Sequence, residues 1–465
     1  MDRVEAAPAT RAAEGRRSAM TSEVPPASEP ILDDAGLPPL PSSIRPIPRT
    51  LFSSLKAWWN ASPQQTAEAE LHLFRSSGYF GGATLGNARG LQTDGPNAIV
   101  DAYQQAQGES GPGPVRVGNQ YATVATQAAA DGKIGCVRAV DLGEDPQMRR
   151  RFRWFGARPA RYVHTLEIGT PTEAGKRPPD EVPVVFVHGY GAGCAFFFKN
   201  IGAIASLPHT RVFALDWLGM GCSARPPYRM PHAPRSDARA EASEHFFVAS
   251  LEQWRAKMQL ERMVLVGHSL GGYLSMAYAL RYPERVSRLV LVSPAGIPEG
   301  SLTKGPPEAR QAPARFSPLF IRVLSYLWDH NVSPFSLLRL SMGLGPMLMG
   351  SYTRRRFGAL DEHEMHALHA YCHGIFLGRS SSEHCLSDLL APGAYARRPM
   401  LHRLAPLRMP IAFFYGDRDW MDVEGGRSAQ RMLDGARVFL VPNAGHHLYL
   451  DNVSYFNQAL QRLVS

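Results

Sequence analysis

One serine of this chain has the sequence surroundings of an activated nucleophile. Ser269 lies in the stretch Val-Leu-Val-Gly-His-Ser-Leu-Gly-Gly, residues 264–272, with a glycine two positions away on each side. The apolar run predicts a strand and the segment Tyr273–Arg281 predicts a helix, so the serine falls on a tight strand-to-helix turn. Glycines permit the close backbone contacts of such a turn. The hydroxyl is then exposed above the sheet, and the N–H of Leu270 faces the position of an oxyanion.

Two later loops carry the acid and the base that a serine nucleophile needs. The apolar run Met409–Tyr415 leads into a loop with three aspartates, and Arg437–Val441 leads into a loop with two histidines. Both runs predict buried strands of a parallel sheet, and their loops therefore lie at the same sheet edge as Ser269. The chain order of serine, acid and histidine indicates a Ser-Asp-His triad.

Within each loop more than one residue fits the role. His446 directly follows a glycine and is preferred to His447, which fits a loop histidine packed beside it. Asp419 has the usual position of the acid, three residues past the glycine of its loop, and Asp422 is its rival. Asp417 is expected to cap the turn. The predicted triad therefore uses Asp419 and His446, with Asp422 as the alternative acid.

A second oxyanion donor is expected from an earlier turn that is rich in glycine. The apolar run Val184–Val187 ends in His-Gly-Tyr-Gly-Ala-Gly, residues 188–193, where glycines let the backbone turn its N–H groups inward. Tyr190 is the expected donor through its main chain. We expect His188 to orient the loop by hydrogen bonding and not to act as a second base. Asp216, in the next loop, is expected to be structural.

The remaining apolar periodicity predicts an α/β protein with a mostly parallel, doubly wound sheet. Its core is expected in two parts, residues 160–299 and 404–465, with helices at Ala195–Ser206, Glu244–Gln259 and Asn452–Val464. Residues 300–403 interrupt the alternation with helical patterns such as Leu319–Trp328 and Leu337–Met349. We expect this insertion between the sixth and seventh strands to form a helical lid over the site, although its apolar stripe fits plain core packing as well.

The chain before residue 160 shows weaker patterns. Residues 1–65 are rich in Pro, Ala and Ser and are expected to be disordered, with a targeting role left open. Residues 66–159 are expected to form an N-terminal extension with a surface insertion, and Gly78–Asp131 to have little regular structure. Leu51–Trp59 fits a short amphipathic helix that touches a membrane. It fits equally well a segment that docks on the core.

Composition limits the class of protein and its partners. With 465 residues and 44% hydrophobic content, the chain can bury one large core with insertions. Its five cysteines lack metal or disulfide spacing, which favours a reducing or redox-neutral compartment, and neither a metal nor a cofactor is expected. The net charge is +9, but no nucleic-acid motif accompanies it. An anionic membrane surface is therefore the expected partner.

Three motifs resemble one part of the α/β-hydrolase superfamily. They are Ala396–Leu404, the Asp-Trp-Met-Asp run that ends at Asp422, and the His-x4-Asp box of His446 and Asp451. They resemble lipid-active proteins that include a lipase co-activator and the fungal cardiolipin-specific deacylases. The resemblance covers roughly residues 160–465, with an echo at Ala67–Ser77, and is nearest to the deacylases.

The resemblance implies deacylation of glycerophospholipids of the cardiolipin or phosphatidic type, in phospholipid remodelling. One alternative is transfer of an acyl group from acyl-CoA to lysophosphatidic acid through His446 and Asp451. A simpler role for Asp451 is favoured, as the N-cap of the last helix. A non-catalytic lipase co-activator is the other alternative. The co-activator has asparagine where this chain has Ser269, which favours an enzyme.

Lid arginines suggest an anionic phospholipid as the substrate, because guanidinium groups bind phosphate in bidentate fashion. A cardiolipin substrate favours a mitochondrial location with peripheral membrane attachment, and a lipid droplet is the other candidate. The basic residues concerned are Arg354–Arg356, Arg379, Arg397, Arg398 and Arg403.

Overall fold

A computed structural model describes most of the chain. The described residues are 40–80, 116–117, 120–125, 129–143, 161–171, 178–297, 326, 332–391 and 395–465. The apolar pattern Leu319–Trp328 lies outside them, apart from Tyr326, and so does most of the predicted insertion Gly78–Asp131.

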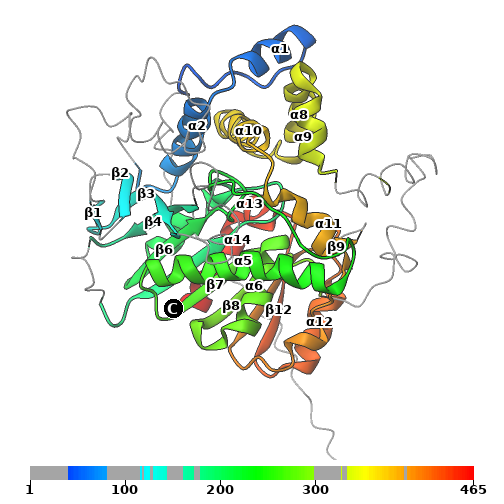
Figure 1. Cartoon of the computed structure of the whole chain (residues 1–465). Helices are drawn as coiled ribbons and strands as arrows, with labels where there is room; N and C mark the ends of the chain where they lie inside the picture. Colours follow the sequence, from blue (N-terminus) through cyan, green and yellow to red (C-terminus); the bar gives the residue numbers. More distant parts are fainter. Residues whose placement is uncertain are drawn as a thin grey trace, which may run out of the picture. The chain divides into compact units, whose positions relative to one another are not determined.

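A ten-stranded sheet organises these residues (Figure 1). Its strand order is β1-β2-β3-β4-β6-β5-β7-β8-β11-β12. Neighbours from β6 to β12 pair in parallel, whereas β1 to β4 pair antiparallel with one another and β4 pairs antiparallel with β6. The strands are β1 (Arg116–Val117), β2 (Gln120–Ala125), β3 (Ile134–Asp141), β4 (Tyr162–Gly169), β5 (Val182–Val187), β6 (Thr210–Leu215), β7 (Met263–His268), β8 (Val286–Val292), β11 (Ile411–Gly416) and β12 (Ala436–Val441).

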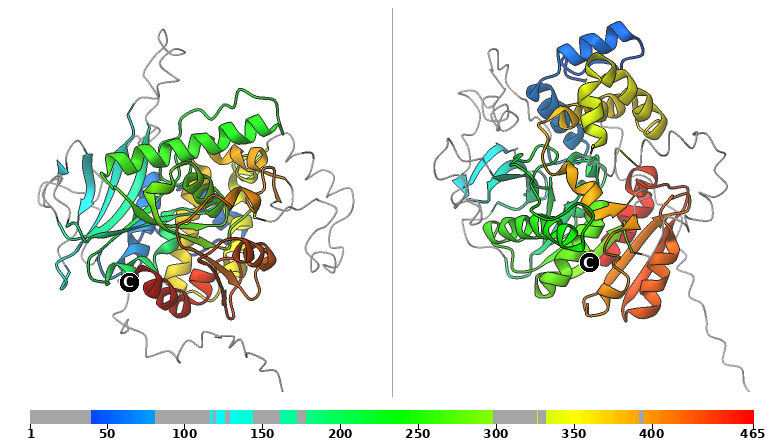
Figure 2. Two further views of the ribbon diagram at one scale, coloured as in Figure 1. Left: turned by 90° about the horizontal axis from the view of Figure 1, so that it is seen from below. Right: turned by 45° about the vertical axis from the view of Figure 1, so that its right-hand side comes forward.

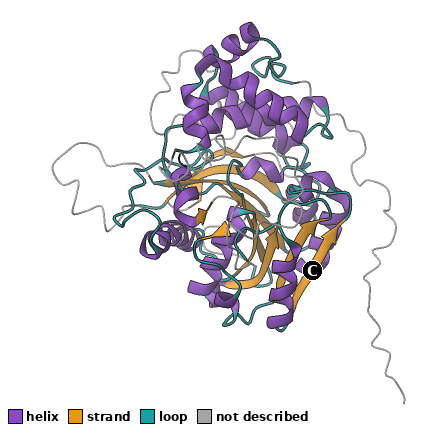
Figure 3. Cartoon of the chain, turned by 90° about the vertical axis from the view of Figure 1, so that its right-hand side faces the viewer, coloured by secondary structure: helices purple, strands orange, loops and turns teal. Residues whose placement is uncertain are grey.

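Helices cover both faces of this sheet, as Figure 3 shows. The longest, α5, lies on one face and α14 on the other (Figure 2). The α-helices are α1 (Leu51–Trp59), α2 (Pro63–Arg75), α4 (Ile201–Ala205), α5 (Asp237–Lys257), α6 (Leu270–Arg281), α8 (Pro334–Leu340), α9 (Gly345–Arg356), α10 (Glu362–Leu377), α11 (Cys385–Leu389), α12 (Val423–Met432), α13 (Leu448–Asp451) and α14 (Val453–Val464).

Alternation along the strands produces two apolar cores. In β5, Val184 and Phe186 face the core that includes α2, α4, α10 and α14, and Val185 and Val187 face the core that includes α5, α6 and α12. Because β5 has a core on each face, its sequence is a continuous apolar run. This arrangement confirms the predicted doubly wound sheet.

The chain between β8 and β11 confirms the predicted helical insertion. It contains α8 to α11 and one short antiparallel pair, β9 (Leu390–Ala391) with β10 (Tyr395–Ala396). An ion pair joins α10 to the core, with Lys199 Nζ 2.8 Å from Glu364 Oε1. Among the described helices, none is both long and apolar enough to cross a membrane.

The N-terminal boundaries predicted from composition were wrong. Residues 40–65 are folded, with Ile44 and Ile47 buried, although disorder was expected through residue 65. Strand β3 lies within the expected extension and pairs along its whole length with β4. Composition did not predict these elements because polar residues form part of them. Ser62 caps α2, and Arg138, which is buried, interrupts the apolar pattern of β3.

Helix α1 has the docking role, which is one of the two that its sequence allowed. Thr50 and Ser53 form a capping box, which fixes where the helix begins. Ser54 is buried, and Leu55 lies against Gly343 of the insertion. The helix therefore docks on the protein, but Phe52 remains 79% exposed and Trp59 80% exposed.

Three histidines lie in the packed region that contains α2 and α10. Burial is the main reason that the pKa of His72 falls to about 4, that of His369 to about 3 and that of His373 to about 4. These side chains stay neutral in the fold at a pH where an unfolded histidine takes up a proton.

We expect acid to destabilise this interface. Stability rises with pH where the unfolded state binds more protons. Each of the three histidines should therefore lower the free energy of unfolding by about 1 kcal/mol at about pH 5.5. Denaturant unfolding at neutral and acid pH measures this loss. His373→Gln should reduce the pH dependence, whereas His232→Gln, at an exposed histidine, should leave it unchanged. Equal pH dependence in wild type and His373→Gln would contradict the assignment.

Candidate active site

Ser269 occupies a strained turn between β7 and α6. Its backbone has φ 54° and ψ −117°, a conformation that costs a non-glycine residue roughly 1–3 kcal/mol. Neighbouring backbone groups hold it there: Ser269 N–H donates to Val292 O at 2.9 Å, and Ala295 N–H donates to Ser269 O at 3.1 Å. A Cβ on Gly267 would lie 2.6 Å from Gly271 O, so the turn requires glycine at this position.

The structure brings the three predicted triad residues together. His446 Nε2 lies 3.0 Å from Ser269 Oγ, and His446 Nδ1 lies 3.1 Å from Asp419 Oδ1. The Asp419 side chain is 1% exposed and the His446 side chain 13% exposed. This chain of contacts allows a proton to pass from the serine to the histidine while the carboxylate fixes the ring.

The other residues of the two loops have different contacts. Asp422 caps α12 by accepting the N–H of Glu424 at 2.8 Å. Asp417 accepts the N–H groups of Asn443 and Ala444, both at 2.9 Å, and so ties the acid loop to the histidine loop. His447 is half-buried and packs near Phe196 and Phe357.

His268 is a positioning residue that the sequence analysis did not single out. Its Nε2 lies 2.9 Å from His446 O, within hydrogen-bond distance of the backbone of the candidate base. Burial and the neighbouring His446 hold the pKa of His268 well below its usual value. A neutral ring with a proton on Nε2 donates this bond. Its position beside Ser269 in the sequence was the available signal.

The glycine-rich loop lies directly against the nucleophile. A Cβ on Gly189 would be 2.9 Å from Ser269 Cβ, which shows how closely the two backbones approach. Among the described residues, no acceptor binds the N–H of Tyr190 or of Leu270. The Tyr190 ring stacks on Phe335 of the insertion, with ring centroids 5.0 Å apart. Tyr190 follows Gly189, which contacts Ser269, and Leu270 follows Ser269 directly, so both expected donors come from segments that adjoin this serine.

His188 stabilises the glycine-rich loop through two hydrogen bonds. Its Nδ1 donates to Gly189 O at 2.8 Å, and its Nε2 accepts the N–H of Trp217 at 3.2 Å. Burial lowers the pKa of His188, which agrees with a neutral ring that uses both nitrogens. The contacts match the expected orienting role.

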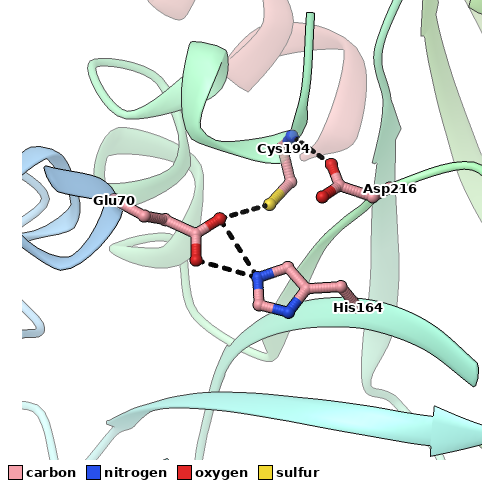
Figure 4. A group of neighbouring side chains, drawn as sticks. All are labelled: Glu70, His164, Cys194 and Asp216. Carbon is pink, nitrogen blue, oxygen red and sulfur yellow. Dashed lines mark hydrogen bonds and ion pairs between the residues drawn. The ribbon is translucent and has the colours of Figure 1, made fainter. Parts of the chain in front are cut away.

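A buried polar cluster fixes the far end of the same loop (Figure 4). The Glu70 carboxylate of α2 lies 2.9 Å from His164 Nε2 and accepts the Cys194 thiol at 3.3 Å. Asp216 accepts the N–H groups of Cys194 and Cys222, both at 2.6 Å. Burial acts to lower the pKa of His164, but the Glu70 carboxylate outweighs it and raises that pKa. Leaving one member of a buried ion pair alone costs about 3–5 kcal/mol.

The donors of this cluster are of types that bind metal ions, and the four ligand atoms lie within 4.8 Å of one another. Each acid already has partners inside the protein, since Glu70 binds His164 and Asp216 accepts two backbone N–H groups. We therefore assign the cluster to loop positioning. All five cysteines are buried free thiols.

Asp451 does not have the predicted helix-capping role. Asn452 caps α14 by accepting the N–H of Tyr455 at 3.2 Å. Asp451 instead accepts the N–H of Gly445 at 2.8 Å and two bonds from the Arg356 guanidinium at 3.0 and 3.1 Å. It joins the histidine loop to α9 because one carboxylate contacts both.

Several arginines of the insertion form ion pairs with acids of the protein itself. Arg356 binds Asp451, and Arg398 and Arg403 both bind Glu244 at 2.8 Å. These guanidinium groups are committed to internal ion pairs, so they do not present the phosphate-binding cluster expected from the sequence.

Known proteins are similar to this chain in sequence. Residues 182–453 match the family described as alpha/beta hydrolase fold. A probable 1-acylglycerol-3-phosphate O-acyltransferase of Oryza sativa subsp. japonica is 33% identical over 339 residues, which cover 70% of this chain and 77% of the relative. The 1-acylglycerol-3-phosphate O-acyltransferase of Arabidopsis thaliana is 34% identical, with 69% of this chain and 74% of the relative covered. The (lyso)-N-acylphosphatidylethanolamine lipase of Mus musculus is 32% identical, with 65% of this chain and 86% of the relative covered.

The chain belongs to the α/β-hydrolase family. Within that family it belongs to the lipid-active group that includes these relatives. The predicted superfamily and subfamily are thereby confirmed at this level.

We expect the two candidate acids to respond differently to substitution. Asp419→Asn should lower the turnover of a short-chain ester by about 10⁴-fold, because an amide stabilises the wrong histidine tautomer. Asp422→Asn is the matched control and should stay near wild type, since asparagine caps a helix about as well as aspartate. Steady-state kinetics measures both. A larger loss in Asp422→Asn would assign the acid role to that residue.

Proposed function

We propose that this protein is a serine hydrolase that deacylates glycerophospholipids. The observation that carries the proposal is the contact chain from Ser269 Oγ through His446 to Asp419, with separations of 3.0 and 3.1 Å. It is supported by the strained backbone of Ser269, which has φ 54°. These features match the requirements of nucleophilic acyl transfer.

In the proposed reaction, Ser269 Oγ attacks the ester carbonyl while His446 Nε2 accepts the hydroxyl proton. The negative charge that forms on the carbonyl oxygen is stabilised by the N–H groups of Tyr190 and Leu270. His446 then donates its proton to the leaving lysophospholipid oxygen, and an acyl-serine remains. Water, deprotonated by His446, attacks the acyl-serine. As the acyl–oxygen bond breaks, His446 returns that proton to Ser269 Oγ and the fatty acid is released. Asp419 holds the Nδ1–H tautomer throughout.

The lipid class is proposed from the relatives and from the surface of the protein. The relatives carry names of lipid acyltransferases and a lipase. Exposed apolar side chains on α1 and on the insertion, such as Phe52 and Leu340, are suited to contact with a lipid surface. We propose anionic phospholipids of the cardiolipin or phosphatidic type as substrates. The mitochondrial location stays a prediction from the family resemblance.

Ser269→Ala should abolish both covalent labelling by a fluorophosphonate probe and phospholipid deacylation, because the nucleophilic oxygen is removed. Ser293→Ala is the control, because this buried serine follows the neighbouring strand β8. Gel fluorescence and mass spectrometry of released fatty acid are the measurements. Deacylation that persists in Ser269→Ala would refute the proposal.

Transfer to a lysophospholipid is the second candidate function, favoured by the acyltransferase names of the relatives. The same acyl-serine would form from acyl-CoA with release of CoA thiol. The hydroxyl of lysophosphatidic acid would then take the place of water. Hydrolysis and transfer would share every protein group, and the acceptor in the site would determine the product. A purely non-catalytic co-activator has no use for the Ser269, His446 and Asp419 contacts.

Asp451→Asn distinguishes a positioning role from a dedicated transfer role. The amide retains an acceptor for Gly445 N–H but loses the ion pair with Arg356, a partly exposed pair worth about 1 kcal/mol. We therefore expect hydrolysis and acyl-CoA-dependent transfer to fall together, by about fivefold. Parallel assays with radiolabelled lipid measure the two rates. Selective loss of transfer would show that Asp451 serves that reaction directly.

A further inference from the structure

A basic cavity lies at the junction of the N-terminal segment and the insertion. It has a volume of about 570 Å³ and is formed by residues 45–57 together with side chains of α9 and α10. Its lining contains no residue of the candidate triad and none of the glycine-rich loop. It is therefore distinct from the site described above.

Positive charge dominates the lining of this basic cavity. Arg45, Arg49, Lys56 and Arg354 contribute four cations, and Glu362 is the single carboxylate. Glu362 lies 3.9 Å from His366, and within the described part of the chain no carboxylate forms an ion pair with any of the four cations. Like charges that line one cavity repel one another, so an anion bound among them is favoured.

One lining cation is fixed in its orientation. Arg354 Nη1 donates to Pro48 O at 3.3 Å, which holds α9 against the N-terminal segment. Among the described residues no acid pairs with Arg354, so nothing in this part of the chain neutralises its positive charge. A guanidinium held in this way is preorganised for an anion.

Helix α1 places an apolar surface beside the cavity. Ser53, Lys56 and Ala57 line the cavity, three and four positions apart on one face of the helix. The neighbouring face carries Phe52 and Trp59, which are 79% and 80% exposed. Aromatic side chains next to cations are suited to the boundary between lipid headgroups and acyl chains.

The insertion extends this apolar surface. Leu55 of α1 contacts Gly343, so α1 and the segment Met342–Leu344 form one surface. Exposed apolar side chains continue along it, with Leu340 at 74%, Met342 at 60% and Leu348 at 57%. Exposed apolar side chains that gather on neighbouring elements are typical of an interaction site.

We propose that the basic cavity binds the phosphomonoester headgroup of phosphatidic acid within a bilayer, with α1 and the insertion lying against the membrane. Four cations suit a phosphomonoester, which carries more negative charge and more free oxygens than a phosphodiester. The choice of a lipid ligand rests on the proposed function, but the cavity binds without catalysis and is separate from Ser269.

Vesicle flotation with Ser269→Ala protein tests the proposal, since binding is then measured without turnover. Vesicles of phosphatidylcholine with a minor fraction of phosphatidic acid should be bound. Vesicles of matched surface charge that contain phosphatidylserine should be bound more weakly, and pure phosphatidylcholine least. Equal binding to the phosphatidylserine and phosphatidic acid vesicles would overturn the proposal. A failure of the catalytic proposal alone would leave all of these results unchanged.

Two double variants distinguish binding in the basic cavity from attraction by general surface charge. Arg45→Gln with Arg49→Gln should weaken binding to phosphatidic acid vesicles by about 30-fold, given the typical contribution of a basic residue at an anionic membrane. Arg437→Gln with Arg462→Gln removes the same charge at exposed positions outside the cavity and should change binding little. Equal losses in the two pairs would overturn the assignment to the cavity. Melting temperatures verify that each variant is folded.

Two further experiments test whether the bound phosphate belongs to a lipid or to a soluble molecule, and whether α1 contributes to binding. Free glycerol 3-phosphate in excess should not displace the protein from vesicles, because it lacks the acyl chains that contact α1. Displacement would show a site for a soluble phosphomonoester and would overturn the membrane part of the proposal. Trp59→Ser should weaken binding to phosphatidic acid vesicles, and unchanged binding would exclude the apolar contact.

Discussion

The left-handed backbone of Ser269 is the constraint on which the rest of the site depends. A non-glycine residue at φ 54° is stable only where surrounding hydrogen bonds hold its backbone. Those bonds come from Val292, at the end of β8, and from Ala295 shortly after it. The turn also needs glycine at 267, because Gly271 O lies where a Cβ would be. The conformation of the candidate nucleophile therefore depends on the packed sheet, because its bonds come from the segments after β8 as well as from the turn between β7 and α6.

Backbone contacts fix the candidate base with similar precision. Asp417 ties its loop to the acid loop, Asp451 accepts the N–H of Gly445, and His268 lies within hydrogen-bond distance of the backbone oxygen of His446. The imidazole is thus held from several directions before any substrate arrives. Such preorganisation lowers the entropy cost of aligning base and nucleophile. The same principle applies to the glycine-rich loop, which His188 and the Glu70 cluster hold at its two ends.

The sequence was sufficient for elements whose signals are local. Ser269, Asp419 and His446 each follow an apolar strand and a recognisable turn, so their meeting at one sheet edge was predicted from the order of strands. Contacts between distant residues were not predictable. Glu70 looks like a solvated helix residue until His164, 94 positions away, pairs with it. Asp451 fitted a helix cap because its partner, Arg356, lies 95 positions earlier. The folded segment after residue 40 was missed because its buried residues are sparse among prolines and charges.

The double attachment of Asp451 has a consequence for how the insertion and the catalytic loop behave together. One carboxylate contacts α9 through Arg356 and the histidine loop through Gly445. A displacement of α9 that breaks the guanidinium contact frees that carboxylate to turn, and the backbone next to His446 loses a restraint at the same time. Movement of α9 and alignment of the candidate base are then not independent events. The fold thus carries a mechanical link through which a movement of α9 reaches the groups proposed to transfer the proton.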